Sequence, residues 1–309
     1  MLHNGHMTNA PGAHRVELDY FVVDVFTRSA LTGNPLAVVF DSVGLSTERM
    51  QAIAREFNLS ETPFVQRRDA AGEQAEGVRV RIFTTEEELP FAGHPTLGTA
   101  SVLKLIAPET LRGDTITLAL NVGPVPVRFE DSETLFGEMT QRDPEFGAEL
   151  DQVEVAQLAG LNVEDLDPTL PPQIVSTGTA FAIVVLRSTE ALSRLRVGQE
   201  AATNWLRLKG ARWFFVLAPT GEEAPAYRAR MQFNGGEDPA TGSAAGCAIS
   251  YLVARGAVTS NKPILVRQGV EIGRASDLFL SAKSDYSKVK DVHVAGGTVL
   301  VAKGQLFLP

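Results

Sequence analysis

Residues 94–100 read HPTLGTA and residues 238–244 read DPATGSA, and the two strings are related. They share Pro, Gly and Ala at matching positions, with Thr matched by Ser, at an offset of 144 residues (238 − 94). A second pair, TGNPLAVVF at 32–40 and TGTAFAIVV at 177–185, shares four of nine positions at an offset of 145 (177 − 32). Two blocks that agree within one residue favour an internal duplication over chance similarity of small-residue strings.

The predicted order of strands and helices repeats in the same way. The first half is predicted to contain strands at 16–26, 32–40, 62–66, 78–83 and 115–129, with a turn at Gly123-Pro124, and helices after Ser46 and from near Pro95 to about Ile106. The second half is predicted to contain a turn and strand at 174–186, strands at 213–217 and 227–233, helices at 199–208 and 241–254, and then short strands. Alternating apolar residues support the strands, and apolar residues three and four apart support the helices.

This pattern predicts an α/β (α+β) protein with two pseudo-symmetric domains. We expect residues 1–15 to form a flexible tail, residues 16–130 the N-terminal repeat domain and residues 131–296 the C-terminal repeat domain. A last strand at about 297–309 is expected to complete the N-terminal domain. Two related domains that face each other create a cleft, which is a common place for ligands.

The composition excludes several classes of function. The chain has 309 residues, of which 44% are hydrophobic and 21% charged, enough for two folded domains. The net charge of −9 disfavours nucleic acid or an anionic membrane as a partner, and no run of about 18 apolar residues predicts a membrane span. One cysteine, Cys247, forms no internal disulfide, and the N-terminus lacks the apolar core of a signal peptide, so we expect a cytoplasmic protein.

Both related strings lie where a helix is predicted to begin. Pro95 suits the first helical turn, and the free N–H groups of that turn, with the helix dipole, favour an anion. His94 stands at this point in the first half, and Asp238 stands at the matching point in the second. Two helix starts that face one cleft would bind a carboxylate without Lys or Arg. The residues expected to bind the substrate there are Gly93, Thr241, Gly242 and Ser243.

Each of these residues also has an ordinary structural interpretation. Asp238 or Thr241 could be a plain helix cap, and Gly242 and Gly246 could serve helix packing alone. His94 could be a buried, hydrogen-bonded histidine without a chemical role, although its pKa range suits proton transfer. The glycine-rich turn lacks the GxGxxG and GxxxxGK[ST] patterns, so we discount a nucleotide-binding loop.

Glu61 lies between a predicted helix and a predicted strand, in the string NLSETPFVQ. A surface position is the usual fate of glutamate, but the flanking Leu59 and Phe64 favour partial burial here. Burial would raise the pKa of Glu61 and make it a usable acid or base. The second half has no acidic residue at a comparable point, so a site that contains Glu61 would be asymmetric.

Three other kinds of site receive less support. A metal site from Glu61, His94, Glu237 and Asp238 lacks a known ligand spacing, and we expect no metal. A Ser-His-Asp hydrolase built on Ser243 lacks the GxSxG elbow. Cys247 is predicted about one turn inside a helix, where it suits packing better than nucleophilic attack.

The blocks GNPLAVV, SETPFV, PFAGHPTLGTA and EDPATGSAAG, in this order, resemble the PhzF family of phenazine-biosynthesis isomerases. The resemblance begins near Val16 and implies a diaminopimelate-epimerase-like fold, in which each domain is a curled, largely antiparallel sheet around a central helix. It also implies a homodimer. It identifies Glu61 with the general acid/base of the family, and His94 and Asp238 with its histidine and aspartate in the cleft.

The resemblance implies a reaction as well. The family's phenazine enzyme isomerises trans-2,3-dihydro-3-hydroxyanthranilate by moving a proton within the ring, without a cofactor. Diaminopimelate epimerases carry two cysteines at the helix starts, where this sequence has His94 and Asp238. We therefore expect an isomerase that acts on a small carboxylate, with Glu61, His94 and Asp238 as catalytic residues. Asn34 in the GNP turn is a further candidate for a substrate contact.

Two other functions stay open at this point. The same cleft could hold a racemase, epimerase or hydrolase with different chemistry. The chain could also be a non-catalytic small-molecule or protein-binding member of the family. Burial of Glu61 away from any cleft, or its exposure far from His94, would favour the binding function.

Overall fold

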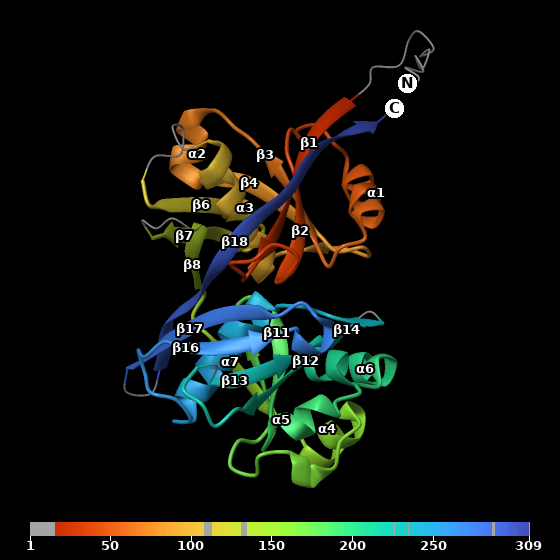
Figure 1. The fold of residues 1–309 in the computed structure, drawn as a ribbon, viewed down its shortest axis with the longest axis vertical. Helices are drawn as coiled ribbons and strands as arrows, with labels where there is room; N and C mark the ends of the chain where they lie inside the picture. Colours follow the sequence, from red (N-terminus) through yellow and green to blue (C-terminus); the bar gives the residue numbers. More distant parts are fainter. Residues whose placement is uncertain are drawn as a thin grey trace.

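The computed structural model describes residues 16–107, 113–130, 135–224, 226–233, 235–285 and 288–308. The predicted tail, residues 1–15, lies outside the described residues. Figure 1 shows two lobes, one above the other, and strand β18 (Lys288–Leu308), which crosses from the lower lobe to the upper one.

The upper, N-terminal lobe is a closed ring of strands. In spatial order its strands are β1 (Val16–Val25), β2 (Asn34–Val39), β3 (Thr62–Gln66), β4 (Val78–Phe83), β6 (Thr115–Leu120), β7 (Gly123–Phe129), β8 (Leu135–Gln141) and β18. The ring closes because β1 pairs with β2 on one side and with β18 on the other. The short strand β5 (Glu88–Leu89) pairs with β4.

The lower, C-terminal lobe continues the same sheet from β18 but stays open. Its order is β17 (Ser276–Asp285), β16 (Ile264–Gln268), β13 (Tyr227–Arg230), β12 (Trp213–Pro219), β11 (Ala180–Val185), β10 (Gln173–Ser176) and β9 (Glu145–Glu149). A separate hairpin, β14 (Gln232–Phe233) with β15 (Gly236–Glu237), leads directly to Asp238. The 3-10 turn η2 (Val270–Ile272) lies between β16 and β17.

One helix fills the inside of each curled sheet. Helix α3 (Gly93–Ile106) has 11 of its 14 residues buried, and helix α7 (Gly242–Ala254) is buried along all of its length except the last residue. A helix that buries every face suits a chain of small and apolar residues without a polar stripe. Both sequences have this composition, so the helices belong inside the sheets and their first turns lie at the seam between the lobes.

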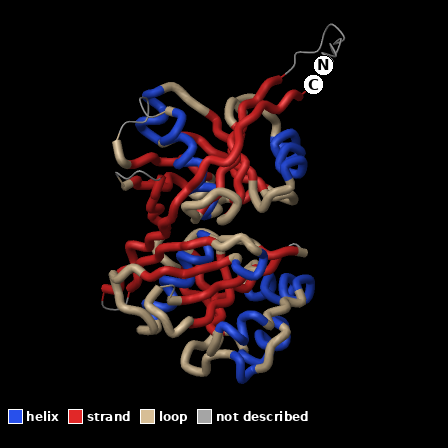
Figure 2. The backbone as a smooth tube through the Cα atoms, viewed as in Figure 1, coloured by secondary structure: helices blue, strands red, loops and turns tan. Residues whose placement is uncertain are grey.

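The remaining helices cover the outside, as Figure 2 shows by colour. They are α1 (Thr47–Phe57) and α2 (Ala70–Glu76) on the N-terminal lobe, and α4 (Gln152–Ala159), α5 (Thr189–Ser193) and α6 (Gln199–Lys209) on the C-terminal lobe. Helix α1 begins as predicted, because the Ser46 hydroxyl accepts a hydrogen bond of 3.3 Å from the Arg49 N–H. Met50, Ile53 and Ala54 form its buried face.

Several local predictions differ from the structure. The chain turns before Gly123-Pro124, which already belong to β7. The predicted strand 227–233 is interrupted at Met231. The prediction of only short C-terminal strands is wrong, because β18 runs for 21 residues. Its length lets it pair with β17 and β8 near one end and with β1 near the other.

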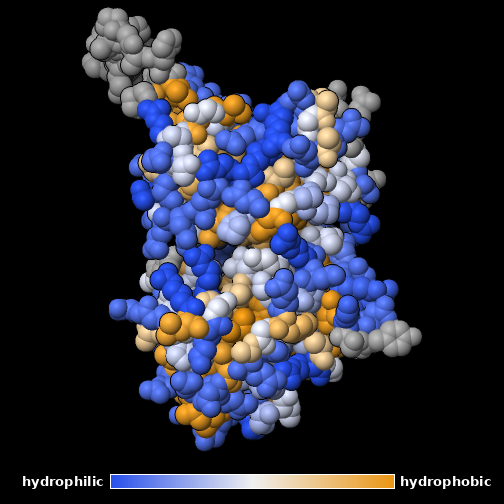
Figure 3. Space-filling view, turned by 180° about the vertical axis from the view of Figure 1, so that it is seen from behind, coloured by the Kyte–Doolittle hydropathy of each residue, from blue (hydrophilic) through white to orange (hydrophobic). Residues whose placement is uncertain are grey.

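The predicted fold class is confirmed: two pseudo-symmetric α/β halves each place a curled sheet around a central helix. The division after residue 130 stays a prediction, and strand β8 beyond it is hydrogen-bonded to β7. Figure 3 shows a surface in which hydrophilic residues surround scattered hydrophobic ones on both lobes. Within the described part of the chain, no helix is long and apolar enough to cross a membrane.

Candidate active site

The starts of α3 and α7 touch each other at the seam between the lobes. A Cβ atom on Gly93 would lie 2.4 Å from the Ser243 nitrogen and 2.5 Å from the Gly242 carbonyl carbon. A Cβ on Gly242 would lie 3.0 Å from the Phe26 ring. Backbone meets backbone here, so only glycine fits at position 93 without moving one helix away from the other.

Neither of these helices has a side-chain cap. The cap positions are Ala92 for α3 and Thr241 for α7, and neither makes a side-chain cap hydrogen bond. The N–H groups of a first helical turn have no partner within the helix, and the helix dipole adds positive potential there. Two uncapped starts in contact therefore form a place that favours an anion.

Asn34 begins strand β2 and joins the two lobes at this point. Its side-chain Nδ2 donates hydrogen bonds of 2.8 Å to Asp238 Oδ1 and 2.8 Å to the Ala240 carbonyl oxygen. The same nitrogen lies 3.2 Å from His94 Nδ1. The amide nitrogen uses its two hydrogens in the two shorter bonds and cannot accept one, so a proton on His94 Nδ1 would find no acceptor here, which favours the ring proton on Nε2.

Asp238 is held by partners from both lobes. Its Oδ2 accepts a hydrogen bond of 2.7 Å from the Thr241 hydroxyl, and its Oδ1 accepts one of 3.3 Å from the Ser60 hydroxyl. Gln268 Nε2 donates 2.8 Å to the Asp238 carbonyl oxygen, and Gln268 Oε1 accepts from the Thr241 N–H at 3.0 Å. Asp238 is thus a fixed group at the seam and not a side-chain cap of α7.

Glu61 and His94 face each other without a hydrogen bond. Glu61 Oε2 lies 3.5 Å from His94 Nε2, and the two side chains are 12% and 3% exposed. Both atoms are buried and have no hydrogen-bond partner among the described residues. Leaving a buried polar atom unpaired costs about 1–3 kcal/mol, so two that face each other indicate a position for a polar ligand.

Burial shifts the proton affinity of all three groups. It raises the pKa of Glu61 well above 4.5, and the negative charge of Asp238 raises it further. Burial also raises the pKa of Asp238 to about 6, against hydrogen bonds from Thr241, Asn34 and Ser60 that lower it. Burial lowers the pKa of His94 to about 3. His94 is therefore neutral at pH 7, and both carboxyl groups keep a proton to a higher pH than an exposed carboxyl group does.

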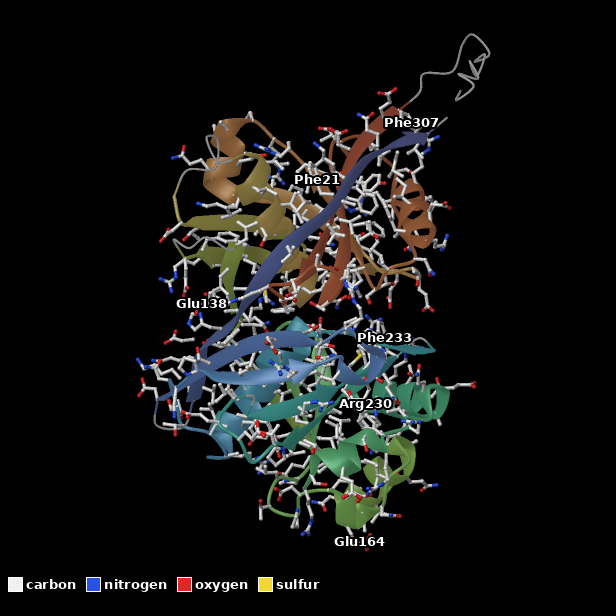
Figure 4. The ribbon with its side chains drawn as sticks, in the orientation of Figure 1. Phe21, Glu138, Glu164, Arg230, Phe233 and Phe307 are labelled. Carbon is white, nitrogen blue, oxygen red and sulfur yellow. The ribbon has the colours of Figure 1, made fainter. Side chains whose placement is uncertain are left out.

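The structure brings together all the candidate residues named from the sequence: Glu61, His94, Asp238, Asn34, Gly93, Thr241, Gly242 and Ser243. The carboxylate of Glu237 accepts hydrogen bonds of 2.9 and 2.6 Å from Arg230. Figure 4 shows Arg230 in the C-terminal lobe. The Glu237 carboxylate is therefore already paired, and the absence of a metal stays a prediction. Cys247 is buried, and burial raises its pKa to about 11, which disfavours a reactive thiolate.

Ser60 and Gln268 are contact residues of Asp238 that the sequence-based set does not include. Ser60 directly precedes Glu61, so its nearness to the site could have been inferred from its position in the chain. Gln268 lies 30 residues after Asp238, on β16, and nothing in the sequence connects the two. Only the order of the strands in the folded sheet brings Gln268 next to Asp238 and Thr241.

The chain is similar to known proteins over most of its length. The family model described as phenazine biosynthesis-like protein, PhzC-PhzF, matches residues 23–304. A trans-2,3-dihydro-3-hydroxyanthranilate isomerase of Pseudomonas aeruginosa is 36% identical over 94% of this chain and 99% of its own. An uncharacterized isomerase of Mesorhizobium japonicum is 34% identical over 94% of this chain and 99% of its own.

Solved structures show the same relationship. A PhzF-family protein of Bacillus anthracis superposes with a TM-score of 0.82 at 26% identity, over 95% of this chain and 100% of that one. A predicted epimerase of Pseudomonas aeruginosa superposes with a TM-score of 0.80 at 34% identity, over 93% of this chain and 98% of that one. The family model and the relatives each span nearly the full chain, and this chain therefore belongs to the PhzC-PhzF family of phenazine biosynthesis-like isomerases.

Proposed function

We propose that this chain is a cofactor-independent isomerase in which Glu61 moves a proton within a small carboxylate. The observation that carries the proposal is the pair of buried, unpartnered atoms, Glu61 Oε2 and His94 Nε2, 3.5 Å apart. The name of the Pseudomonas aeruginosa relative, a trans-2,3-dihydro-3-hydroxyanthranilate isomerase, favours a cyclic, unsaturated amino acid as the substrate.

The reaction needs one proton carrier and no change of oxidation state. The ionised Glu61 removes a proton from an activated carbon, so that a C–H bond breaks, an O–H bond forms and the electron pair enters the π-system of the substrate. The O–H bond then breaks, and the proton forms a new C–H bond elsewhere on the same molecule. The raised pKa of Glu61 brings it closer to the working pH, which suits a group that both takes and returns a proton.

The other residues of the site stabilise the charge that develops. His94 is neutral and carries its proton on Nε2, so it can donate a hydrogen bond to the substrate as negative charge forms there. The unpaired N–H groups at the starts of α3 and α7, near Gly93, Gly242 and Ser243, would hold the substrate carboxylate. Fixed donors in a buried site need no reorganisation during the reaction.

Replacement of the proton carrier tests the proposal. Glu61→Gln keeps the shape of the side chain but cannot remove a proton, and its turnover should fall roughly 10²–10⁴-fold. Glu56→Gln is the matched control, because Glu56 is an exposed glutamate on α1. Near-full turnover by Glu61→Gln on an identified substrate would rule out the proposed role.

Epimerisation is the second candidate. It is favoured by the pKa of Asp238, about 6, which gives the site a second buried carboxyl group capable of proton transfer. An epimerase removes a proton and returns one to the same carbon from the other face. In D₂O it would therefore place deuterium at the original carbon without moving a double bond. A purely binding role is disfavoured, because Glu61 is buried next to His94.

Three finer predictions accompany this function. We expect a homodimer, which light scattering on the purified chain would test. We expect the chain to act in the cytoplasm, which fractionation of the source cells would test. We also expect the two halves to derive from an internal duplication, with His94 and Asp238 at equivalent helix starts and no counterpart of Glu61 in the second half.

A further inference from the structure

We infer that Arg274 is a positioning residue of this site: by holding the turn that carries Asn34, it fixes which ring nitrogen of His94 bears the proton. The inference rests on the proposed function for its catalytic meaning, but its structural content concerns only contacts within the chain. Arg274 lies in the C-terminal lobe, in the short segment between η2 and β17. The turn lies in the N-terminal lobe, between β1 and β2.

The guanidinium group of Arg274 bonds three acceptors of the opposite lobe. Its Nη2 donates 2.6 Å to Asp24 Oδ1 and 3.0 Å to the Thr32 carbonyl oxygen, and its Nε donates 3.0 Å to the Gly33 carbonyl oxygen. The Gly33 N–H donates in return to the Ala275 carbonyl oxygen at 3.0 Å. Arginine presents its donors in a rigid fork, so these contacts fix the direction of the turn as well as its distance.

The turn needs such support. Gly33 has φ +70°, and a Cβ on it would lie 2.4 Å from the Val25 carbonyl oxygen. Leu31, which is not a glycine, has φ 68° and an exposed side chain. Non-glycine residues in this region are strained, and they keep the conformation only when their surroundings impose it. Asp24 supplies a second support, because its Oδ2 accepts a 2.6 Å hydrogen bond from the Leu31 N–H.

The segment that carries Arg274 also holds Asp238. Gln268 lies just before this segment and donates to the Asp238 carbonyl oxygen. The Arg274 N–H donates 2.9 Å to the Gly269 carbonyl oxygen, and a Cβ on Gly269 would meet the Pro239 carbonyl oxygen at 2.7 Å. Arg274 therefore fixes the position of Asn34 relative to the segment around Asp238, to which Asn34 is hydrogen-bonded.

Asn34 connects this turn to His94. It follows Gly33 directly, is fully buried, and directs its Nδ2 at His94 Nδ1, 3.2 Å away. A proton on His94 Nδ1 would meet an amide nitrogen that cannot accept it, so this contact favours the Nε2–H form. If the turn moves, His94 Nδ1 loses this neighbour and can take the proton. Nε2 would then face Glu61 and the substrate as an acceptor, and the donor of the proposed reaction would be lost.

The test is ¹⁵N NMR of histidine-labelled protein without substrate, on the full chain at neutral pH. Protonated and unprotonated ring nitrogens have well-separated shifts, and a His94→Gln sample identifies the His94 signals. Arg274→Met removes the guanidinium group and keeps an unbranched side chain. Arg267→Met is the matched control, because Arg267 pairs with Asp277 at 2.6 and 2.9 Å within the β16–β17 hairpin.

We expect the wild type and Arg267→Met to show an unprotonated Nδ1 and a protonated Nε2 for His94. Folded Arg274→Met should show both forms in exchange. Its turnover should fall about 10²-fold, with a smaller change in KM. The reason is that displacing a hydrogen-bond donor mainly raises the free energy of the transition state. Wild-type His94 shifts in folded Arg274→Met would overturn the inference, and so would an equal change in Arg267→Met.

Arg274→Lys keeps the test decisive if Arg274→Met does not fold. Lysine retains the charge beside Asp24, whose side chain is 3% exposed, but a single ammonium cannot reproduce the fork. A mixture of both ring forms in Arg274→Lys supports the inference, and the wild-type form alone overturns it. The NMR measurement does not depend on turnover. The activity of Glu61→Gln therefore tests the proposed function, and the His94 ring form in Arg274→Met tests this inference independently.

Discussion

His94 Nε2 lies 3.5 Å from Glu61 Oε2, and neither atom has a hydrogen-bond partner within the described part of the chain. The distance is too long for a direct hydrogen bond, and His94, with a pKa of about 3, is neutral at pH 7. The contact is therefore not an ion pair that stabilises the fold. It is a donor and a carboxyl group side by side at the meeting point of two uncapped helices, which suits a substrate that contacts both.

The buried Glu61 should make the protein less stable as the pH rises. Its folded pKa is raised above 4.5, so the folded state binds the proton more tightly than the unfolded state. Stability is then lost as the pH rises from 4.5 through the folded pKa. Glu61→Gln does not lose stability in this way, because glutamine does not titrate. Its Tm should exceed that of the wild type by a margin that grows as the pH rises above 4.5. A margin that is constant or shrinks would contradict the burial of a titrating carboxyl group, and Glu56→Gln should show no such margin.

Asp238 should control the titration of Glu61. The charge of Asp238 raises the pKa of Glu61, although burial is the larger cause. Asp238→Asn removes that charge, so Glu61 should ionise at a lower pH while remaining above 4.5. Infrared difference spectroscopy of the protonated carboxyl band across the pH range measures this directly. Asp277→Asn on β17 serves as the control, since Asp277 pairs with Arg267 outside the site. An unchanged Glu61 titration in Asp238→Asn would disprove the coupling.

Gly93→Ala should damage both stability and activity. The new Cβ would lie 2.4 to 2.7 Å from backbone atoms of Ser243 and Gly242, so one helix start must shift. Overpacking of this kind costs about 1–3 kcal/mol, and a displacement of about 1 Å at the site costs about 10²-fold in turnover. Gly198→Ala is the control, because Gly198 is the cap residue before α6 and its nearest contact for a Cβ is 3.8 Å away. Denaturant unfolding and turnover measure the two effects, and equal behaviour of both variants would contradict the close approach.

Thr99→Val should stabilise the protein and leave its activity unchanged. Thr99 is fully buried on α3, and its hydroxyl has no hydrogen-bond partner among the described residues. Valine has nearly the same shape and removes the desolvated hydroxyl, whose burial costs about 1–3 kcal/mol. Chemical denaturation should show a gain within that range. A loss of stability would mean that the hydroxyl has a partner, and a loss of activity would place Thr99 in the site.

Local structure could be predicted well from the sequence where the apolar pattern is strong. Strands at 62–66 and 78–83 have the predicted bounds, and the central helices begin within about two residues of the expected positions. Helices α4 and α5 were not predicted, because each is short and buries only part of its surface against the outside of a sheet. The length of β18 could not be inferred, because its two ends pair with strands far apart in the sequence.

The residues of the site also differ in how well they could be predicted from the sequence. His94 and Asp238 could be placed together because a repeated motif put both at helix starts. The apolar residues beside Glu61 indicated only a partly buried carboxyl group, and its role as the acid/base followed from the family resemblance. Arg274 could not be found from the sequence, because the residue it pairs with, Asp24, is 250 positions away. Such contacts depend on the strand order of the folded chain.

The most direct test of the account is deuterium placement by the wild type, Glu56→Gln and Glu61→Gln in D₂O. The substrates are trans-2,3-dihydro-3-hydroxyanthranilate and a panel of cyclic, unsaturated amino acids, followed by proton NMR. The account predicts a shifted double bond in the wild type and Glu56→Gln, with any exchanged deuterium at the carbon that receives the proton. It predicts a rate roughly 10²–10⁴-fold lower in Glu61→Gln. A shifted double bond formed at the wild-type rate by Glu61→Gln, or deuterium only at the original carbon, would contradict it.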